Sequence, residues 1–224
     1  MSLNTFMPAL TLLATLVLGA CVASSPVITH DGLHSVPSKS FDAMYRKPDV
    51  DISAYRAIGL APCSVSFRNN WLRDQNRSRL DLSNRVTQKH VDQIKEHLSA
   101  ACEQHFRKAL LSDPAYHLVD DFSQGEAVLV LRPSIIDLDI NAPDLRSSTR
   151  QTTYTTSAGE MTLSLDLVDA TSNEVLGRVV DRKRAVDHHR LQWTNSVTNS
   201  AEANRMLRSW ALRLRAALDE ARSQ

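Results

Sequence analysis

The chain has 224 residues, of which 42% are hydrophobic, 5% aromatic and 23% charged. This composition is typical of a globular protein and excludes a disordered or linker protein, and a domain of this size buries roughly 70% of its unfolded surface without needing disulfides. The 26 basic and 25 acidic residues leave a net charge of +1, which excludes the strongly basic surface typical of nucleic-acid binding.

The N-terminal segment has the pattern of a lipoprotein signal. Residues 1–20 carry no charge, and the apolar run 6–18 is shorter than the roughly 20 residues that span a bilayer. The run ends in Leu18-Gly19-Ala20-Cys21, which resembles the lipobox of bacterial lipoproteins. The resemblance implies that residues 1–20 are a signal peptide that is removed, and that Cys21 receives a diacylglycerol and a palmitate-like acyl chain. The alternative is a buried, unmodified cysteine after an ordinary signal peptide.

An acylated Cys21 predicts a lipid bilayer as the first partner. Each buried methylene contributes about 0.8 kcal/mol, so three acyl chains hold a protein on the membrane permanently. Val22 stands where an Asp marks inner-membrane retention in such lipoproteins, so the resemblance implies an outer-membrane protein that faces the periplasm. Residues 21–48 contain Ser and Pro with little periodicity and are predicted to be a tether.

The first element of the folded part is an apolar strand within residues 51–67. Ile58 and Leu60 are flanked by other apolar residues, which favours an interior strand, and Pro62 predicts a bulge or an unpaired edge. Residues 68–81 contain several arginines around Trp71. Such a segment could contact phosphate or lipid headgroups, but we favour a solvated connection with Trp71 lying on the core.

A long amphipathic helix is predicted over residues 87–112. One apolar stripe recurs every three or four residues along it, through Val91, Ile94, Leu98, Ala101, Cys102 and Ala109. Cys102 and His105 are three residues apart and could reach one metal ion. No second Cys/His pair accompanies them, so we predict a hydrogen-bonded neutral histidine at the edge of the core, and no metal or cofactor.

Two further strands are predicted before the chain becomes polar, a short one at 116–122 and a long one at 126–143. The second half of the long strand alternates, which places Ile136, Leu138 and Ile140 inward and Asp137 and Asp139 outward. Two carboxylates on one strand face could bind a cation or share a proton. We interpret them as residues that keep an exposed face soluble.

A hairpin of residues 161–167 and 175–180 is the clearest strand signal. Asn173 can take the left-handed conformation that ends the connecting turn, and the register then sets Asp166 opposite Arg178. The same register places Val175, Gly177 and Val179 on the face of the hairpin that carries the leucines. Because one face of the hairpin is so apolar, other elements must cover it.

Residues 144–158 are rich in Ser, Thr and Arg and form either a mobile loop or an exposed edge strand. As a strand, the segment is a candidate partner surface with Tyr154 as its anchor, made of Thr152, Thr153, Tyr154, Thr155 and Thr156. A second long helix is predicted from about residue 199, with Glu202 in a capping box. Its stripe is Met206, Leu207, Trp210, Leu214, Ala217, Leu218 and Ala221, and the arginines away from that stripe are Arg205, Arg208, Arg213 and Arg215.

The predicted order is β-α-β-β-β-β-α, which indicates a single α+β domain over residues 49–224. The expected architecture is a two-layer sandwich, a mixed and mostly antiparallel sheet with two long helices on one face. The blocks PDVDISAYRAIGL, SVSFRNNW, NAPDL, SAGEMTLSLDLVDATSNEVLGRVVDR and NSVTNSAEANRMLRSWALRLRAALD resemble a proteobacterial lipoprotein family known only as a domain of unknown function. That resemblance implies an envelope location and supplies no catalytic residues.

The remaining cysteines, Cys63 and Cys102, are predicted to form a disulfide. One lies on a buried strand and the other on the helix stripe facing it, in an oxidising compartment. A bridge of that span contributes about 4 kcal/mol in the chain-entropy model. The alternative is two buried thiols.

The sequence contains no G-x-S-x-G, H-E-x-x-H or phosphate-loop motif. We therefore predict a non-enzymatic outer-membrane lipoprotein that serves as a partner-binding or accessory module of the cell envelope, with an envelope protein as its partner. The alternative is an envelope hydrolase with a scattered site, which a deep pocket with convergent titratable groups would favour.

Overall fold

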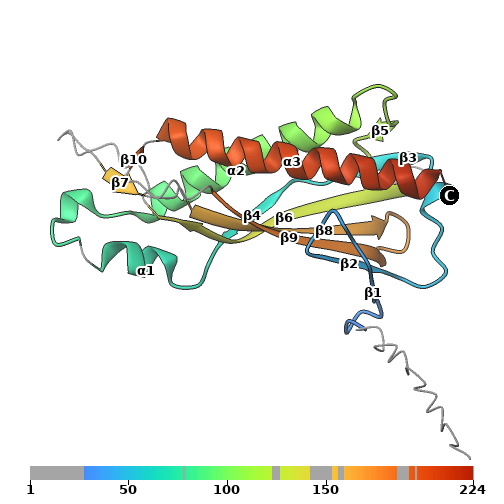
Figure 1. Cartoon of the computed structure of the whole chain (residues 1–224), viewed down its shortest axis with the longest axis horizontal. Coiled ribbons are helices and arrows are strands. Elements are labelled where there is room, and N and C mark those ends of the chain that lie inside the picture. Colours follow the sequence, from blue (N-terminus) through green and yellow to red (C-terminus); the bar gives the residue numbers. More distant parts are fainter. Residues whose placement is uncertain are drawn as a thin grey trace, which may run out of the picture.

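The computed structural model describes residues 28–77, 79–122, 127–141, 153–155, 159–185, 192–194 and 196–223. Two long helices lie side by side over one face of an open, mixed sheet of eight strands (Figure 1). The predicted fold class, a two-layer α+β sandwich, is confirmed. Among the described helices, none is long and apolar enough to cross a membrane.

The sheet is built outward from one long central strand, β6 (Val128–Ile140). On one side follow β8 (Gly159–Asp169), β9 (Val175–Arg184), β2 (Ala43–Arg46) and β1 (His34–Val36), all antiparallel to their neighbours. On the other side β3 (Ala57–Leu60) and β4 (Ser64–Phe67) both run parallel to β6, and β5 (Leu118–Val119) pairs with β3. The single strand predicted for residues 51–67 is thus two strands, interrupted at the segment that holds Pro62.

The β8–β9 hairpin has the predicted turn and register. Asn173 has φ 59°, and Asp166 lies opposite Arg178, whose Nε donates to the Asp166 carboxylate at 2.6 Å. The prediction that Val175 lies on the same face as the leucines is wrong, because a bulge in the ladder pairs Val175 with Val168. Both residues belong to a smaller apolar cluster, separate from the leucines of the main core.

A second bulge, in β6, changes which of its side chains point toward the core. Asp137 has φ 51°, and the pairing with β8 slips between Ile136 and Asp139. Ile135 and Leu138 are therefore the buried residues, and the prediction that Ile136 points inward with Leu138 is wrong.

The helices are α1 (Trp71–Asn76), α2 (Gln88–Leu110) and α3 (Ser196–Arg222), and two short 3₁₀ turns are η1 (Ile52–Ala54) and η2 (Leu82–Asn84). Thr87 caps α2, accepting from the His90 backbone N–H, so this helix closely matches its prediction. Helix α3 begins three residues before the predicted start, so Glu202 lies inside the helix and pairs with Arg205 at 2.7 Å instead of capping. Between the helices and the sheet the core contains Leu98, Cys102, Phe106, Leu163, Leu165, Leu207, Trp210 and Leu214.

Two other sequence predictions need correction. Much of the predicted tether belongs to the fold, because β1 and β2 lie in the sheet and Leu33 and Phe41 are buried. The sequence places Arg215 on the side of α3 away from its apolar stripe, but the structure buries it. Its guanidinium group donates to a backbone carbonyl at the end of α2, so it lies between the two helices instead of in solvent. All described strands and the core lie between residues 28 and 223.

Candidate functional site

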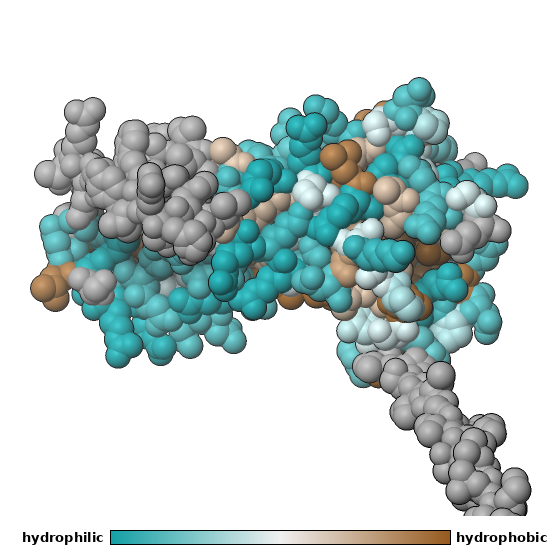
Figure 2. Space-filling view, viewed as in Figure 1, coloured by the Kyte–Doolittle hydropathy of each residue, from teal (hydrophilic) through white to brown (hydrophobic). Residues whose placement is uncertain are grey.

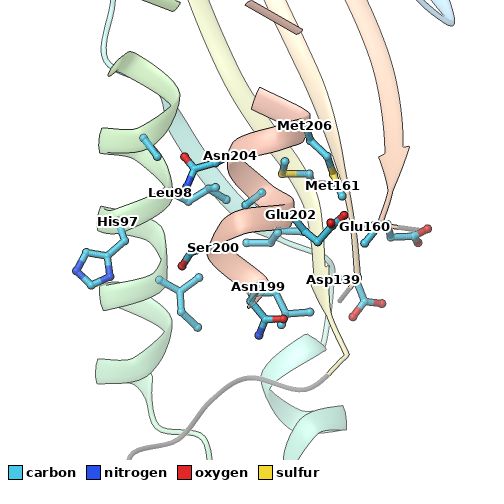
Figure 3. A pocket seen from close by; sticks show the side chains of 17 residues that line it. His97, Leu98, Asp139, Glu160, Met161, Asn199, Ser200, Glu202, Asn204 and Met206 are labelled. Carbon is cyan, nitrogen blue, oxygen red and sulfur yellow. The ribbon is translucent and has the colours of Figure 1, made fainter. Parts of the chain in front are cut away.

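A cavity of about 260 Å³ opens between α2, α3 and the neighbouring ends of β6 and β8. Most of its wall is apolar, because the stripes of both helices continue to the end of the sheet (Figure 3). The apolar side chains that line it are Ile94, Leu98, Ala101, Leu138, Ile140, Met161, Ala185, Ala203 and Met206. An apolar hollow with a few polar groups at its rim is the usual form of a binding site.

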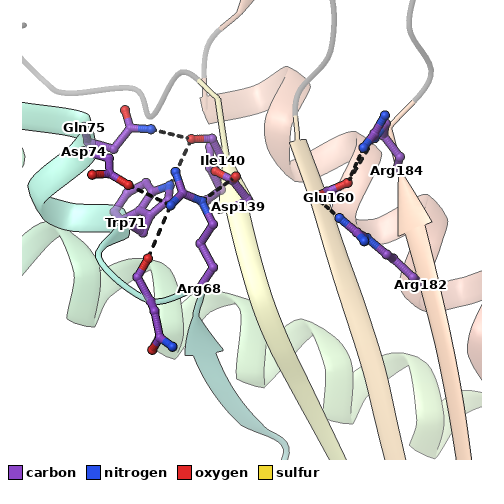
Figure 4. Close-up of polar contacts among 10 residues, drawn as sticks. Arg68, Trp71, Asp74, Gln75, Asp139, Ile140, Glu160, Arg182 and Arg184 are labelled. Atoms are coloured by element: carbon purple, nitrogen blue, oxygen red, sulfur yellow. Dashed lines mark hydrogen bonds and ion pairs between the residues drawn. The ribbon is translucent and has the colours of Figure 1, made fainter.

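The carboxylates at the rim are held by arginines. Asp139 accepts from Arg68 Nε at 2.6 Å, and Glu160 accepts from Arg182 and from Arg184, the latter at 2.9 Å (Figure 4). The third carboxylate, Glu202, is the partner of Arg205 noted above. His97 also borders the cavity, but its ring points away from the space between the helices (Figure 3).

These pairings decide what the carboxylates can do chemically. Burial raises the pKa of Glu160, but the hydrogen bonds and charges of Arg182 and Arg184 outweigh it and hold the pKa below its usual value. A carboxylate that stays ionised and is bound by two guanidinium groups is a poor proton donor or acceptor near neutral pH. The arrangement therefore suits orientation of a bound group better than proton transfer.

Helix α1 closes the end of β6 beside this cavity. Arg68 bridges Asp139 and Asp74, while Trp71 Nε1 and Gln75 Nε2 donate to the Ile140 carbonyl at 3.2 and 3.0 Å (Figure 4). Trp71 is 1% exposed, which confirms that it lies on the core. The segment predicted to be a solvated connection nevertheless contains a helix.

The cation site that Asp137 and Asp139 could have formed is not assembled. Asp139 is engaged by Arg68, and Asp137 is exposed at the bulge of β6. Within the described parts of the chain, no group of three His, Cys, Asp or Glu residues could hold a metal ion.

The structure joins Cys63 and Cys102 in a disulfide, with their Cα atoms 6.2 Å apart. Cys102 is therefore not available to share a metal ion with His105. Instead, His105 Nε2 lies 2.9 Å from Asn204 Oδ1, across the contact between α2 and α3. This confirms the prediction of a hydrogen-bonded histidine at the edge of the core.

The predicted partner surface is described only in part. Strand β7 (Thr153–Thr155) pairs antiparallel with β10 (Gln192–Thr194) in a separate two-stranded ribbon, so the strand alternative applies and β7 is not an edge of the main sheet. Thr152 and Thr156 lie outside the described residues, as does Cys21.

The sheet face away from the long helices is partly covered at the β8–β9 hairpin. Thr162 is buried, and Arg178 binds Asp31 of the N-terminal segment at 3.0 Å as well as Asp166. This contact brings the N-terminal segment onto the hairpin.

The residues of this candidate site that the sequence did not reveal are the arginines around the cavity. Arg182 and Arg184 alternate on β9, and both meet Glu160 because it faces Arg184 across the ladder. The alternation was visible in the sequence, but the pairing depends on how far β8 and β9 extend.

A family model described as "Protein of unknown function (DUF3313)" matches residues 24–214. No curated protein matches the chain. Among solved structures, the chain is similar to a PelC dodecamer from Paraburkholderia phytofirmans, with 9% identity, coverage of 76% of this chain and 96% of that chain, and a TM-score of 0.36. It is also similar to a neuraminyllactose-binding hemagglutinin homologue from Helicobacter pylori, with 12% identity, coverage of 84% and 93%, and a TM-score of 0.36. Likeness at these TM-scores carries no argument about function.

Proposed function

The chain belongs to the DUF3313 family of proteins of unknown function, and from this premise we propose that it is a non-enzymatic lipoprotein of the cell envelope that binds a partner at the cavity between α2 and α3. In this proposal Cys21 carries the acyl chains that anchor the protein in the outer membrane, facing the periplasm. The observation that carries the binding role is the combination of an apolar wall with rim carboxylates already engaged by arginines.

The cavity favours an apolar group of modest size. Its volume of about 260 Å³ lies just below the range of about 300–1,000 Å³ typical of small-molecule sites. An apolar side chain or a short hydrocarbon group entering it would gain about 25 cal/mol for each Å² removed from water. The Glu160–Arg184 and Asp139–Arg68 pairs at the rim offer hydrogen bonds that would orient a polar end.

Two independent observations support the envelope location. The lipobox resemblance ends at Cys21, directly after an apolar run of signal-peptide length. The disulfide between Cys63 and Cys102 is a bond that persists in oxidising compartments such as the periplasm.

The anchor is tested by metabolic labelling with a palmitate analogue. We expect the wild-type protein to be labelled and Cys21→Ser to remain unlabelled and to leave the membrane fraction. Equal labelling of the two proteins would contradict the anchor and, with it, the proposed location.

The binding role is tested by photo-crosslinking in cells, with a crosslinking amino acid placed at Ala203 in the cavity wall. Ala100 is the matched control, because it is exposed on α2 and does not line the cavity. We expect an adduct, identified by mass spectrometry, at Ala203 and none at Ala100. Equal adducts at both positions, or none at Ala203, would exclude the cavity as the binding site.

The segment with β7 remains a second candidate partner surface, because a two-stranded ribbon can add a partner strand through backbone hydrogen bonds. Replacing residues 152–156 by a Gly/Ser segment distinguishes the two. Loss of the Ala203 adduct in a folded protein would assign recognition to this segment also, whereas an unchanged adduct would assign it to the cavity alone.

A further inference from the structure

The loop between α1 and α2 carries two strongly exposed leucines. Leu80 is 94% exposed and Leu82 is 74% exposed, more than any other large hydrophobic residue in the described part of the chain. The loop lies at one end of the long axis of the molecule (Figure 1), and Figure 2 shows a hydrophobic group at that end, next to hydrophilic residues. A single exposed leucine needs no explanation, but two at one apex indicate a contact surface.

The exposure of these leucines is imposed by an ordered frame. Asn76 closes the loop, since its side chain donates to the Val86 carbonyl and accepts from the Val86 N–H, both at 2.8 Å. Arg79 also closes the loop, donating to the carbonyls of Gln75 and Asn84 at 2.9 Å each. The loop thus holds a half-buried arginine against backbone carbonyls while its leucines are exposed, the reverse of the usual arrangement.

The same region concentrates positive charge. Residues 68–85 contain five arginines and two aspartates, a net charge of +3 in a chain whose total is +1. Asp74 is held mainly by Arg68, with Arg73 at 3.5 Å, and Asp81 accepts from Asn84 at 3.4 Å. The two aspartates therefore leave this segment with a net positive charge.

Three of these arginines surround one hollow. Arg73, Arg77 and Arg85 are exposed, and together with Asn76 they are the described residues that line a depression of about 640 Å³. Guanidinium groups bind phosphate oxygens in pairs of parallel hydrogen bonds, so converging arginines of this kind suit a phosphate-bearing partner.

We infer that this end of the molecule, the leucine tip (Leu80, Leu82, Arg73, Arg77 and Arg85), docks on a bilayer surface that contains anionic phospholipid. The leucines enter the boundary between headgroups and acyl chains, and the arginines bind headgroup phosphates, the combination that holds interfacial segments on membranes. The inference involves neither Cys21 nor the cavity, so it stands or fails independently of the proposed function.

The test is vesicle flotation with the chain of residues 22–224, which retains every described residue and lacks the predicted anchor. Vesicles are made of phosphatidylcholine alone or of phosphatidylcholine with phosphatidylglycerol. We expect the protein to float with the anionic vesicles only, and the bound fraction to fall as salt is added. Each of Leu80→Ser and Leu82→Ser should weaken partitioning by about tenfold, and each of Arg73→Gln, Arg77→Gln and Arg85→Gln by about fivefold.

Matched controls are Leu212→Ser and Arg208→Gln, which alter an exposed leucine and an exposed arginine on α3. Both should partition like the wild type, and circular dichroism should show that all variants are folded. Absence of flotation with anionic vesicles would overturn the inference. That result is expected if the tip binds an acidic protein instead of a bilayer. Equal partitioning of the tip variants and the wild type would overturn it too.

Discussion

A large effect of a single substitution on stability is expected at Arg215, which lies on α3 but completes the end of α2. This residue is 7% exposed, and its Nη1 donates to the carbonyls of Ala109, Leu110 and Ser112 at 3.1 to 3.2 Å. The last carbonyls of a helix have no partner within the helix, so Arg215 supplies one from a different element. Its Nη2 also donates to the Pro114 carbonyl.

The change Arg215→Met keeps much of the apolar stem and removes every one of these donors. Nη1 has two hydrogens to share among three carbonyls, and Nη2 contributes one more bond, so three full hydrogen bonds from a charged group are lost. At the lower value of about 1.5 kcal/mol each, the loss is about 4.5 kcal/mol. The ion pair with Asp219 adds at most about 0.5 kcal/mol, because that carboxylate is 51% exposed. The total is a large part of the roughly 5–15 kcal/mol by which domains are stable.

The assay is equilibrium unfolding in urea, comparing midpoints at constant m-value for the oxidised protein. The control is Arg208→Met, an exposed arginine of the same helix, which should change the free energy of unfolding by less than about 0.5 kcal/mol. A loss below about 1 kcal/mol for Arg215→Met, with the m-value unchanged, would refute the reasoning that the guanidinium completes α2.

Two further predictions concern the disulfide and the tyrosines. Reduction of the Cys63–Cys102 bridge, whose cysteines are 39 residues apart, should lower the free energy of unfolding by about 4 kcal/mol in urea titrations, and reductant should have no effect on a Cys63→Ala/Cys102→Ala chain. Burial, together with a hydrogen bond to a carboxylate, raises the pKa of both Tyr55 and Tyr116 to about 12 from 10.0. Because the folded-state pKa is the higher one, the stabilisation is complete below pH 10 and is lost as the pH rises from 10 to about 12. Absorbance titration should show two tyrosines ionising late, and ionisation of all tyrosines near pH 10 in the folded protein would contradict this.

The elements predicted best from the sequence are those whose signals are local. The period-2 pattern of β8 and the turn at Asn173 determine the register that sets Asp166 opposite Arg178. Thr87 and the apolar stripe determine α2 in the same way. Both bulges were missed, because Asp137 at positive φ and the slip before Val168 depend on pairing across strands.

The candidate site was less predictable than the fold. Residues such as Leu98 and Met206 were correctly predicted to lie on apolar stripes, but the cavity arises where two helices and two strand ends meet. Arg215 was misassigned for a related reason, since its charge suggested the solvent side and its carbonyl partners follow from the contact between α2 and α3. Contacts between distant segments leave no periodic trace in a single sequence.

The pairing of β2 with β9 has a consequence for the order in which the chain folds. Ala43 lies beside Val180, and Asp42 and Asp181 each accept a backbone N–H from the other strand, so the first part of the sheet depends on the last hairpin. Strands β1 and β2 alone form only a short hairpin, which is marginal in water. Contacts between such distant residues form slowly, because a long loop must close before they stabilise anything. Until residues 175–184 pair with it, β2 therefore presents an open edge to which a strand of another chain can add.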